Sequence, residues 1–390
     1  MDTPIKVMTV FGTRPEAVKM APLVKVLEQQ EGIESLVCVT AQHREMLDQV
    51  LEVFDIHPDD DLDIMEPKQS LGTITRKALS GLEDVIAARK PDIVLVHGDT
   101  TTTFAAALAA FYHQTAIGHV EAGLRTYDKY SPFPEEMNRQ LADVLCDLYF
   151  APTTWAAENL WREGKSPEKV FVTGNTVVDA MKTTVRQSYQ HPVLDSIPKG
   201  ARLIYMTSHR RENLGEKLHN ICNAARQLAD TFEDVHLVYP VHLNPSVREV
   251  AFDILGGHPR IHLIDPLGVV DNHNFLARST LILTDSGGIQ EEAPSLGVPV
   301  LVLRDTTERP EGISAGTLKL VGTNQEDIYN EAVHLLTDEQ AYRDMAGRKN
   351  PYGDGYASER IVQAILHYFG RGPRPEPFTY RVGMSNDLQR

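Results

Sequence analysis

An apolar run meets a small-residue turn in the stretch Leu281-Ile282-Leu283-Thr284-Asp285-Ser286-Gly287-Gly288-Ile289-Gln290-Glu291-Glu292. This order predicts a buried strand that runs directly into a tight turn and then into a helix. The two glycines leave backbone N–H groups uncovered, Ser286 adds a hydroxyl, and the helix start supplies unpaired donors and the positive end of its dipole. The turn is therefore a candidate phosphate site, although an ordinary turn between a strand and a helix can have the same residues.

The glutamate at the end of this stretch indicates what the phosphate is attached to. By its spacing, Glu292 is better placed to accept hydrogen bonds from sugar hydroxyls than to face an anion. Hydrogen-bond donors for a phosphate, followed by a carboxylate for sugar hydroxyls, form the pattern expected for a binding site of a nucleoside diphosphate with its ribose.

Apolar strand-like runs alternate with amphipathic helical stretches along most of the chain. Strands with few polar positions, separated by helices, indicate parallel sheets that are covered by helices on both faces. Two such series in a chain of 390 residues predict an α/β protein with two Rossmann-like domains. The predicted strands lie at 6–11, 35–40, 92–97, 116–120, 148–151 and 170–173 in the first series, and at 202–207, 235–241, 261–264, 281–284, 298–303 and 318–321 in the second.

The break between the domains is predicted where the last strand of the first series ends. This places the first domain at 1–174 and the second, which contains the phosphate turn, at 175–356. The final helix, at about 357–369, is amphipathic and is expected to pack back on the first domain. Glycines and prolines follow that helix and cannot continue it, so residues 370–390 are predicted to form a flexible tail.

The composition is that of a globular protein with an acidic surface. Hydrophobic residues make up 42% of the chain, and the net charge of −16 argues against nucleic-acid binding through a general basic surface. No stretch approaches the roughly 20 apolar residues that span a bilayer, and the N-terminus has no signal-peptide core, so we expect a cytoplasmic protein without a membrane partner. Cys38, Cys146 and Cys222 are far apart and form no CxxC pair, which predicts buried thiols rather than disulfides or a zinc site.

Ligands of open parallel sheets gather at the carboxyl ends of the strands, where this chain is rich in charged residues. After the first strand, Thr13 and Glu16 have capping-box spacing, and Arg14 and Lys19 lie around the same helix start. Two cations at the positive end of a helix dipole are unfavourable unless an anion compensates them. The arrangement indicates another contact to an anionic ligand, with a solvated helix start as the alternative.

Carboxylates follow further strands of the first domain. Asp99 comes after the third strand, Glu121 after the fourth, and Glu135 a little later. Each alone could be a helix cap or a surface charge. Together in one cleft they would suit proton transfer, because burial and neighbouring like charges raise the pKa of one member towards the working pH. His209, after the first strand of the second domain, is either a donor to a phosphate or leaving group or a structural histidine.

A series of ordered motifs resembles the non-hydrolysing bacterial UDP-N-acetylglucosamine 2-epimerases. The resemblance runs from about residue 5 to residue 368 and leaves only the tail uncovered. The motifs are Phe11-Gly12-Thr13-Arg14-Pro15-Glu16, His97-Gly98-Asp99-Thr100, His119-Val120-Glu121-Ala122-Gly123-Leu124-Arg125, Pro134-Glu135-Glu136-x-Asn138-Arg139, Thr173-Gly174-Asn175-Thr176, His209-Arg210-Arg211-Glu212-Asn213, Thr284-Asp285-Ser286-Gly287-Gly288-Ile289-Gln290-Glu291-Glu292 and Asp305-Thr306-Thr307-Glu308-Arg309-Pro310-Glu311.

The resemblance implies a GT-B fold, in which two Rossmann-like domains with parallel sheets face an interdomain cleft and close over a UDP-sugar. It implies an isomerase that converts UDP-N-acetylglucosamine reversibly to UDP-N-acetylmannosamine for cell-surface polysaccharide biosynthesis. In this family UDP is eliminated to give 2-acetamidoglucal and is then added back with the opposite configuration at C2. No redox step occurs and protein groups handle the charge, so we expect neither a cofactor nor a metal.

The resemblance also assigns residues to this chemistry. The hydrogen on C2 is weakly acidic, so its removal requires the C1 diphosphate to leave, and the leaving group needs positive or donor groups. Carried over by motif, the catalytic residues are Asp99, Glu121 and Glu135, the acid/base candidates, with His209. The implied substrate- and UDP-binding residues are Arg14, Lys19, Arg139, Ser286, Gly287, Gly288 and Glu292.

Some bacterial members are activated by their own substrate, which binds beside the active site. Lys68 occupies a position where we expect arginine. Lysine cannot form the two parallel hydrogen bonds that arginine makes to a phosphate, so the second site is expected to bind more weakly but still to exist. The family's habit also suggests a homodimer. The residues that resemble the allosteric site are Gln42, His43, Gln69, Arg210 and His242.

Three other functions fit parts of the pattern. A retaining GT-B glycosyltransferase shares the fold and the nucleotide site, but it uses an acceptor sugar and needs no cluster of acid/base carboxylates. A hydrolysing 2-epimerase would release free N-acetylmannosamine and UDP. A nucleotide-sugar-binding regulator without turnover would have no use for Asp99, Glu121 and Glu135 together.

Overall fold

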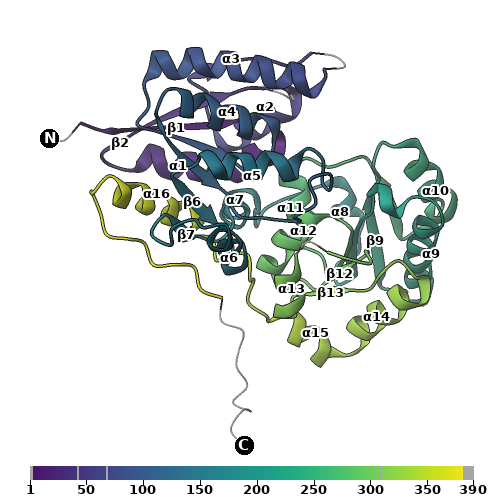
Figure 1. Cartoon of the computed structure of the whole chain (residues 1–390). Coiled ribbons are helices and arrows are strands. Elements are labelled where there is room, and N and C mark those ends of the chain that lie inside the picture. Colours follow the sequence, from purple (N-terminus) through teal and green to yellow (C-terminus); the bar gives the residue numbers. More distant parts are fainter. Residues whose placement is uncertain (1–2, 42–43, 67–68, 308, 381–390) are drawn as a thin grey trace, which may run out of the picture. The chain divides into compact units, whose positions relative to one another are not determined.

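Each predicted series of strands forms its own parallel sheet in the structure, a computed structural model that describes residues 3–41, 44–66, 69–307 and 309–380. The chain divides into two units (Figure 1). Unit 1 contains the residues up to Thr183 together with Tyr352–Thr379, and unit 2 contains Thr184–Pro351. Each unit has its own core of buried apolar side chains from strands and helices.

Within the described residues, the sheet of unit 1 has seven strands in the order β3-β2-β1-β4-β5-β6-β7, and all neighbours run parallel. The chain moves outward from β1 to β3 and then returns to β4. The carboxyl ends of β1 and β4 therefore meet at the switch point where such sheets bind ligands. The strands are β1 (Ile5–Phe11), β2 (Ile33–Val39), β3 (Asp60–Asp61), β4 (Ile93–His97), β5 (Ala116–Val120), β6 (Leu148–Ala151) and β7 (Val170–Val172).

Helices cover both faces of this sheet, as right-handed crossovers require. On one face α1 packs against α2 and α16, and on the other α4 packs against α3 and α5 (Figure 1). Buried alanines such as Ala105 and Ala109 let α4 lie close to the strands. The helices are α1 (Arg14–Gln29), α2 (Arg44–Phe54), α3 (Leu71–Arg89), α4 (Thr101–Tyr112), α5 (Glu135–Leu145), α6 (Thr154–Arg162), α7 (Thr176–Thr184) and α16 (Ala357–Tyr368).

In the described part of unit 2, six parallel strands follow the order β10-β9-β8-β11-β12-β13, and the order again reverses beside the first strand. The strands are β8 (Arg202–Thr207), β9 (Val235–Pro240), β10 (Ile261–Ile264), β11 (Leu281–Thr284), β12 (Val300–Val302) and β13 (Leu318–Leu320). The helices are α8 (Pro192–Ser196), η1 (Arg211–Asn213), α9 (Glu216–Thr231), α10 (Pro245–Leu255), α11 (Val269–Ala277), α12 (Gly287–Glu292), η2 (Ala293–Leu296), α13 (Pro310–Ala315), α14 (Gln325–Thr337) and α15 (Glu339–Ala346).

The strands predicted from the sequence are all present, with ends that differ by at most two residues. The structure adds β3, a two-residue strand of aspartates, which carries no apolar run and so gives no sequence signal. The three cysteines are buried free thiols, as predicted. Over the described residues, no helix is both long enough and apolar enough to cross a membrane.

The boundary between the units falls after Thr183, in the last turn of α7, nine residues beyond the predicted break after 174. Asp179 on α7 accepts hydrogen bonds from the N–H groups of Ala357 (3.2 Å) and Ser358 (2.8 Å) at the start of α16. Since α16 also packs on α1, these contacts keep α7 and α16 with unit 1.

The prediction of a flexible tail from residue 370 onward does not hold for residues 370–379, which pack along unit 1. The guanidinium of Arg374 donates to the carbonyl oxygens of Glu168 (2.7 Å) and Val170 (2.8 Å) and lies over the ring of Phe171. The N–H of Phe378 donates to the Val172 carbonyl (2.8 Å), and its ring is buried. Glycine and proline prevent a helix here, but they do not prevent an extended segment from packing. Residues 381–390 lie outside the described part of the chain.

Candidate functional site

The turn after β4 places Asp99 at the carboxyl edge of the unit 1 sheet. Gly98 has φ +67°, a left-handed conformation that glycine adopts without strain. Its N–H donates to the Val120 carbonyl at the end of β5 (2.9 Å). The side-chain amide of Asn138, on α5, donates to the Asp99 carbonyl (3.0 Å). The backbone that carries Asp99 is therefore fixed to two neighbouring elements.

The environment of Asp99 favours its protonated form. Burial raises the pKa of its carboxyl, Arg139 opposes that rise, and the carboxylates of Glu121 and Glu135 add to it. Arg139 Nη2 lies 3.4 Å from Asp99 Oδ2, and 33% of the Asp99 side chain remains exposed although protein surrounds the carboxyl. The structure thus brings Glu121 and Glu135 within electrostatic reach of Asp99. A partly accessible carboxyl of this kind can exchange a proton with a ligand.

Glu121 has an unusual backbone and firm partners. Its φ of 66° is left-handed, which costs a non-glycine residue on the order of 1–2 kcal/mol and is most often found at functional sites. The carboxylate accepts a hydrogen bond from the amide of Asn175 (2.9 Å) and forms an ion pair with Lys19. These two partners favour the ionised carboxylate. The structure therefore brings the predicted residues Lys19 and Glu121 into contact.

His97 lies against the same carboxylate. Its Nε2 is 3.7 Å from Glu121 Oε2, and only 4% of the residue is exposed. Burial lowers the pKa of His97 to about 4, an effect that Glu121 opposes and Lys19 strengthens. The ring is therefore neutral at pH 7 and shields one side of Glu121 from water without cancelling its charge.

The adjacent glutamates at the start of α5 have different roles. Glu136 is buried and accepts hydrogen bonds from the N–H groups of Thr126 (3.1 Å) and Tyr127 (2.9 Å), so it anchors the loop before the helix. Glu135 is the first residue of α5 and contributes to the raised pKa of Asp99. This division supports Glu135, rather than Glu136, as the residue available for chemistry.

Glu16 connects the starts of two helices at this edge. Its carboxylate accepts hydrogen bonds from the N–H of Thr13 (2.8 Å), which closes the capping box of α1, and from the hydroxyl of Thr100 (2.7 Å), which caps α4. Arg14 is the first residue of α1 and is half-buried at the same edge. The predicted capping box is confirmed, and it positions the helix that carries both Arg14 and Lys19.

In unit 2, the buried Asp285 organises the turn that carries His209. Its Oδ2 accepts hydrogen bonds from the N–H groups of His209 and Arg210, both at 2.9 Å, and from the amide of Asn213 at 3.0 Å. Its Oδ1 lies 3.4 Å from His209 Nδ1. Burial lowers the pKa of His209, and Asp285 opposes that shift. The ring keeps 40% of its side-chain surface exposed, so it is accessible to a ligand.

The predicted phosphate turn is the start of α12. Ser286 is the N-cap residue, its side chain makes no cap hydrogen bond, and Gly287 begins the helix. A Cβ atom at Gly287 would lie 2.8 Å from the guanidinium carbon of Arg309. Nε of Arg309 also donates to Glu291 at 2.9 Å. A side chain at position 287 would therefore displace the Arg309 guanidinium from the turn.

Glu292 ends α12 beside a buried histidine. His273 Nε2 lies 3.5 Å from Glu292 Oε2, and Nδ1 of the same ring is 2.7 Å from the hydroxyl of Thr184. The side chain of Glu292 is 14% exposed. Its neighbour Glu291 is paired with Arg309, so the two glutamates of the motif point to different partners.

The predicted allosteric residues are only partly described. His242 stacks on His209, with 5.5 Å between ring centroids and 12° between ring planes. Arg210 follows His209 in the turn held by Asp285, whereas Gln69 belongs to unit 1 and donates to the Ile64 carbonyl. Gln42 and His43, and also Lys68, lie outside the described residues.

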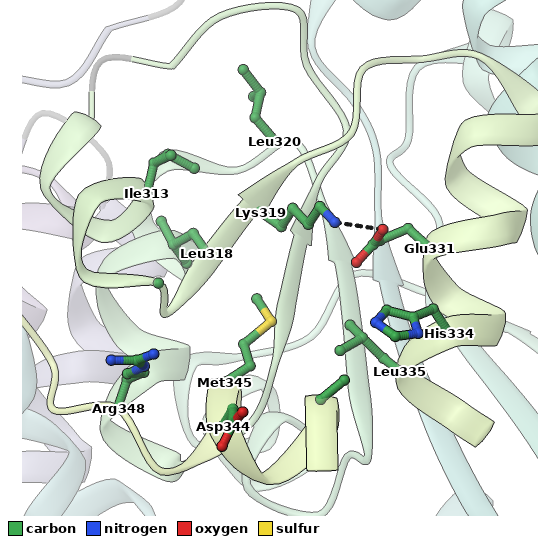
Figure 2. Close-up of a pocket in the computed structure, with 12 residues that line it drawn as sticks. Ile313, Leu318, Lys319, Leu320, Glu331, His334, Leu335, Asp344, Met345 and Arg348 are labelled. Atoms are coloured by element: carbon green, nitrogen blue, oxygen red, sulfur yellow. Dashed lines mark ion pairs between the residues drawn. The ribbon is translucent and has the colours of Figure 1, made fainter. Parts of the chain in front are cut away.

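Unit 2 also has a cavity of about 440 Å³ beside the edge strand β13 (Figure 2). Apolar side chains such as Leu318 and Met345 line it together with charged ones, and Lys319 forms an ion pair with Glu331 at 2.6 Å (Figure 2). None of the residues predicted for the site lines this cavity. Within the described residues, no group of three His, Cys, Asp or Glu side chains could hold a metal ion.

Sequence reasoning recognised the motifs but missed several residues that hold the site together. Asn175 contacts Glu121, Asp285 holds the His209 turn, and Arg309 packs on the phosphate turn. All three belong to motifs that resemble the family, so the motifs themselves are the signal that could have found them. Their partners lie far away in the sequence, which hides the contacts.

The fold and the site define a GT-B protein of the nucleotide-sugar class. It has two Rossmann-type units with charged strand ends, a group of carboxylates in unit 1, and a glycine turn with an adjacent cation in unit 2. The chain belongs to the UDP-N-acetylglucosamine 2-epimerase family, whose model matches residues 25–366.

Similar proteins cover almost the whole chain. The UDP-N-acetylglucosamine 2-epimerase of Bacillus subtilis strain 168 is 61% identical over 376 residues, which is 96% of this chain and 99% of that protein. MnaA of Staphylococcus aureus, solved with UDP, is 57% identical with a TM-score of 0.88, and the match covers 96% of this chain and 100% of the other. The UDP-GlcNAc 2-epimerase of Neisseria meningitidis, solved with UDP-GlcNAc, is 50% identical with a TM-score of 0.85, over 93% and 100% of the two chains.

Proposed function

We propose that this protein is a non-hydrolysing 2-epimerase, an isomerase that interconverts UDP-N-acetylglucosamine and UDP-N-acetylmannosamine for cell-surface polysaccharide synthesis. The observation that carries the proposal is the group of three carboxylates in which Glu121 and Glu135 both lie within electrostatic reach of Asp99. Inversion at C2 removes a proton on one face of the sugar and returns one on the other, so it needs more than one acid/base group. The cytoplasmic location stays a prediction from the sequence.

The reaction proceeds by elimination and re-addition. A base takes the C2 proton while the C1–O bond to UDP breaks, which gives 2-acetamidoglucal and UDP. UDP then adds back to C1 as C2 receives a proton on the opposite face. Glu121, ion-paired with Lys19, is suited to accept a proton, and Asp99, whose pKa burial raises, is suited to carry one.

Unit 2 supplies the groups that hold the leaving UDP. The N–H groups of Gly287 and Gly288, the hydroxyl of Ser286 and the ring of His209 donate to the diphosphate, and Arg309 adds positive charge beside the turn. Glu292 accepts hydrogen bonds from the ribose hydroxyls. Arg14, Lys19 and Arg139 of unit 1 balance the remaining negative charge. The reaction involves no change of oxidation state, so the proposal includes no cofactor.

Incubation with UDP-N-acetylglucosamine alone in D₂O tests this function. NMR should show UDP-N-acetylmannosamine with deuterium at C2, because the proton is exchanged through the intermediate. Prolonged incubation should also release a little free UDP and 2-acetamidoglucal. Retention of the C2 hydrogen during epimerisation would contradict the elimination route.

The same experiment separates the alternatives. Free N-acetylmannosamine with a stoichiometric amount of UDP would indicate a hydrolysing epimerase. Turnover only after an acceptor sugar is added would indicate a glycosyltransferase. Binding without any product would indicate a regulator.

Regulation by the substrate is part of the proposal. The stacking of His242 on His209 supports it, because it joins a residue of the predicted allosteric set to a candidate for catalysis. UDP-N-acetylmannosamine supplied alone should be converted slowly until a trace of UDP-N-acetylglucosamine is added, and Gln42→Ala should weaken that response. Full turnover of pure UDP-N-acetylmannosamine without a lag would exclude the regulation and leave the catalytic proposal intact.

A further inference from the structure

A network of hydrogen-bonded side chains lies next to the Gly98–Asp99 turn in unit 1. His119, on β5, is fully buried, and its Nδ1 lies 2.6 Å from Oδ1 of Asp143 on α5. The other oxygen of Asp143 accepts a hydrogen bond from Arg125 (2.6 Å), and Arg125 is also bound by both oxygens of Glu163 at 2.7 Å. Arg125 and Asp143 are buried and paired with each other, as buried charges require, and the partly exposed Glu163 is a second partner of Arg125.

At one end, this network contacts the turn that carries Asp99. Nε2 of His119 lies 2.7 Å from the carbonyl oxygen of Gly98, the residue before Asp99. A carbonyl oxygen only accepts hydrogen bonds, and an ionised carboxylate does the same. Burial alone would raise the pKa of Asp143, but the charges and hydrogen bonds of His119 and Arg125 outweigh it and lower that pKa, so Asp143 is ionised. Because the Gly98 carbonyl only accepts, Nε2 of His119 carries a proton and donates to it.

The Gly98–Asp99 turn has no other side-chain donor to the Gly98 carbonyl among the described hydrogen bonds. Its remaining backbone contacts are the N–H of Gly98 to Val120 (2.9 Å) and the Asp99 carbonyl to Asn138 (3.0 Å). A Cβ at Gly98 would lie 4.0 Å from Oε1 of Glu121, so the turn passes directly beside the second carboxylate. A shift of this turn would change the positions of Asp99 and Glu121 relative to each other.

We propose that His119 is a positioning residue for the epimerase reaction: oriented by Asp143, its Nε2–H group holds the Gly98 carbonyl and thereby fixes the position of the Asp99 carboxyl. The inference rests on the proposed role of Asp99. His119 touches neither the substrate nor the reacting atoms, and it acts only through the turn. If His119 served only to link β5 to α5, its hydrogen bond to Asp143 would be sufficient, and the hydrogen bond to Gly98 would not be needed.

Two amide substitutions separate these roles. The amide nitrogen of glutamine can take the place of Nε2 and still donate to Gly98, whereas the shorter asparagine can reach only the place of Nδ1 and donate to Asp143. We expect His119→Asn to lower kcat by about tenfold or more with KM changed by less than about threefold, and His119→Gln to keep most of the wild-type kcat. Equal kcat values for the two variants, or a better one for His119→Asn, would overturn the proposal.

A double-mutant cycle tests whether the effect passes through Asp99. In an Asp99→Asn background, His119→Asn should lower kcat by less than about threefold, because the carboxyl that it positions is already gone. The same tenfold loss in both backgrounds would overturn the inference and leave the role of Asp99 intact. Full turnover by Asp99→Asn alone would instead overturn the proposed role of Asp99, and the inference with it.

His236→Asn is the matched control, since His236 is also a buried histidine on a parallel strand, in unit 2. It should leave kcat unchanged even if it lowers the melting temperature. Should His119→Asn not fold, ¹⁵N NMR of the ring nitrogens of the wild-type protein decides the matter, with His119→Gln used for assignment. A protonated Nε2 is expected for His119, and an unprotonated Nε2 would overturn the proposal.

Discussion

At the scale of single residues, the candidate site contains a glutamate, Glu121, whose backbone has an unfavourable conformation. Glu121 stands in a left-handed conformation, and the contacts to Lys19 and Asn175 hold its side chain in that strained position. The sequence predicted Glu121 and Lys19 as separate candidates from their motifs. The sequence could not predict their ion pair, because the two residues are 102 positions apart. The pair also depends on the left-handed backbone of Glu121, which a glutamate in the sequence does not indicate.

Removal of the charge from each candidate carboxylate should stop the reaction without unfolding the protein. Asp99→Asn, Glu121→Gln and Glu135→Gln should each lower turnover by about a hundredfold or more, since proton transfer by a positioned group contributes about that much. Circular dichroism and UDP binding by calorimetry should stay as in the wild type. Glu168→Gln, at an exposed glutamate of unit 1, is the control and should keep full turnover. A variant with wild-type turnover would remove its residue from the mechanism.

The nucleotide contact can be tested apart from the chemistry. Glu292→Ala should weaken UDP binding by about 1–3 kcal/mol, the usual effect of losing one charged hydrogen-bond partner. Calorimetry with UDP measures this directly, and the Asp99→Asn variant serves as a comparison that should bind UDP normally. Unchanged affinity would exclude Glu292 from the ribose site.

At the scale of helices and strands, hydrophobic patterning was sufficient for most of the architecture. Apolar runs identified every strand except β3, whose two aspartates carry no such signal. The polar residues after β1, β4, β5 and β11 were correctly placed at strand ends, because a parallel sheet collects those ends at one edge. The buried pair of His119 and Asp143 was not foreseen, since a histidine in a strand and an aspartate in a helix are both common on protein surfaces.

This buried pair should make the stability of the protein sensitive to acid. The pKa of Asp143 is lower in the folded protein than its ordinary value of 3.8, so its ionised form stabilises the fold above about pH 4. That contribution is lost as the pH falls through the folded pKa. Asp143→Asn should therefore lower the free energy of unfolding by about 3 kcal/mol or more at pH 7, because it removes the buried carboxylate that is paired with Arg125.

Urea denaturation between pH 7 and pH 3 measures this effect. The difference between wild type and Asp143→Asn should shrink as the pH falls below about 4. Asp48→Asn is the control, because its pair with Arg44 on α2 is exposed and should contribute at most about 0.5 kcal/mol. A difference that stays constant over the whole pH range would show that the charge of Asp143 does not stabilise the fold.

At the scale of the whole molecule, the proposed homodimer requires an apolar surface, and unit 1 has one on α4 and α5. Phe111, Tyr112 and Val144 are 53%, 57% and 70% exposed, and the two helices pack against each other. These residues lie at the carboxyl ends of their helices. A helix that follows a strand of a parallel sheet runs back antiparallel to it, so these ends are at the sheet edge opposite the candidate site. A dimer formed through this surface would leave the site accessible.

Charge placed on this surface should therefore separate the subunits and spare the chemistry of each. Val144→Asp, alone or with Phe111→Asp, should give a monomer in analytical ultracentrifugation at micromolar concentration, where we expect the wild type to sediment as a dimer. A carboxylate in an apolar interface loses its water without gaining a partner, and that desolvation opposes association. Leu243→Asp is the matched control, because Leu243 is also an apolar residue that is 64% exposed, and it belongs to unit 2. A wild type that sediments as a monomer would contradict the homodimer, and a dimeric Val144→Asp, Phe111→Asp variant would place the interface elsewhere.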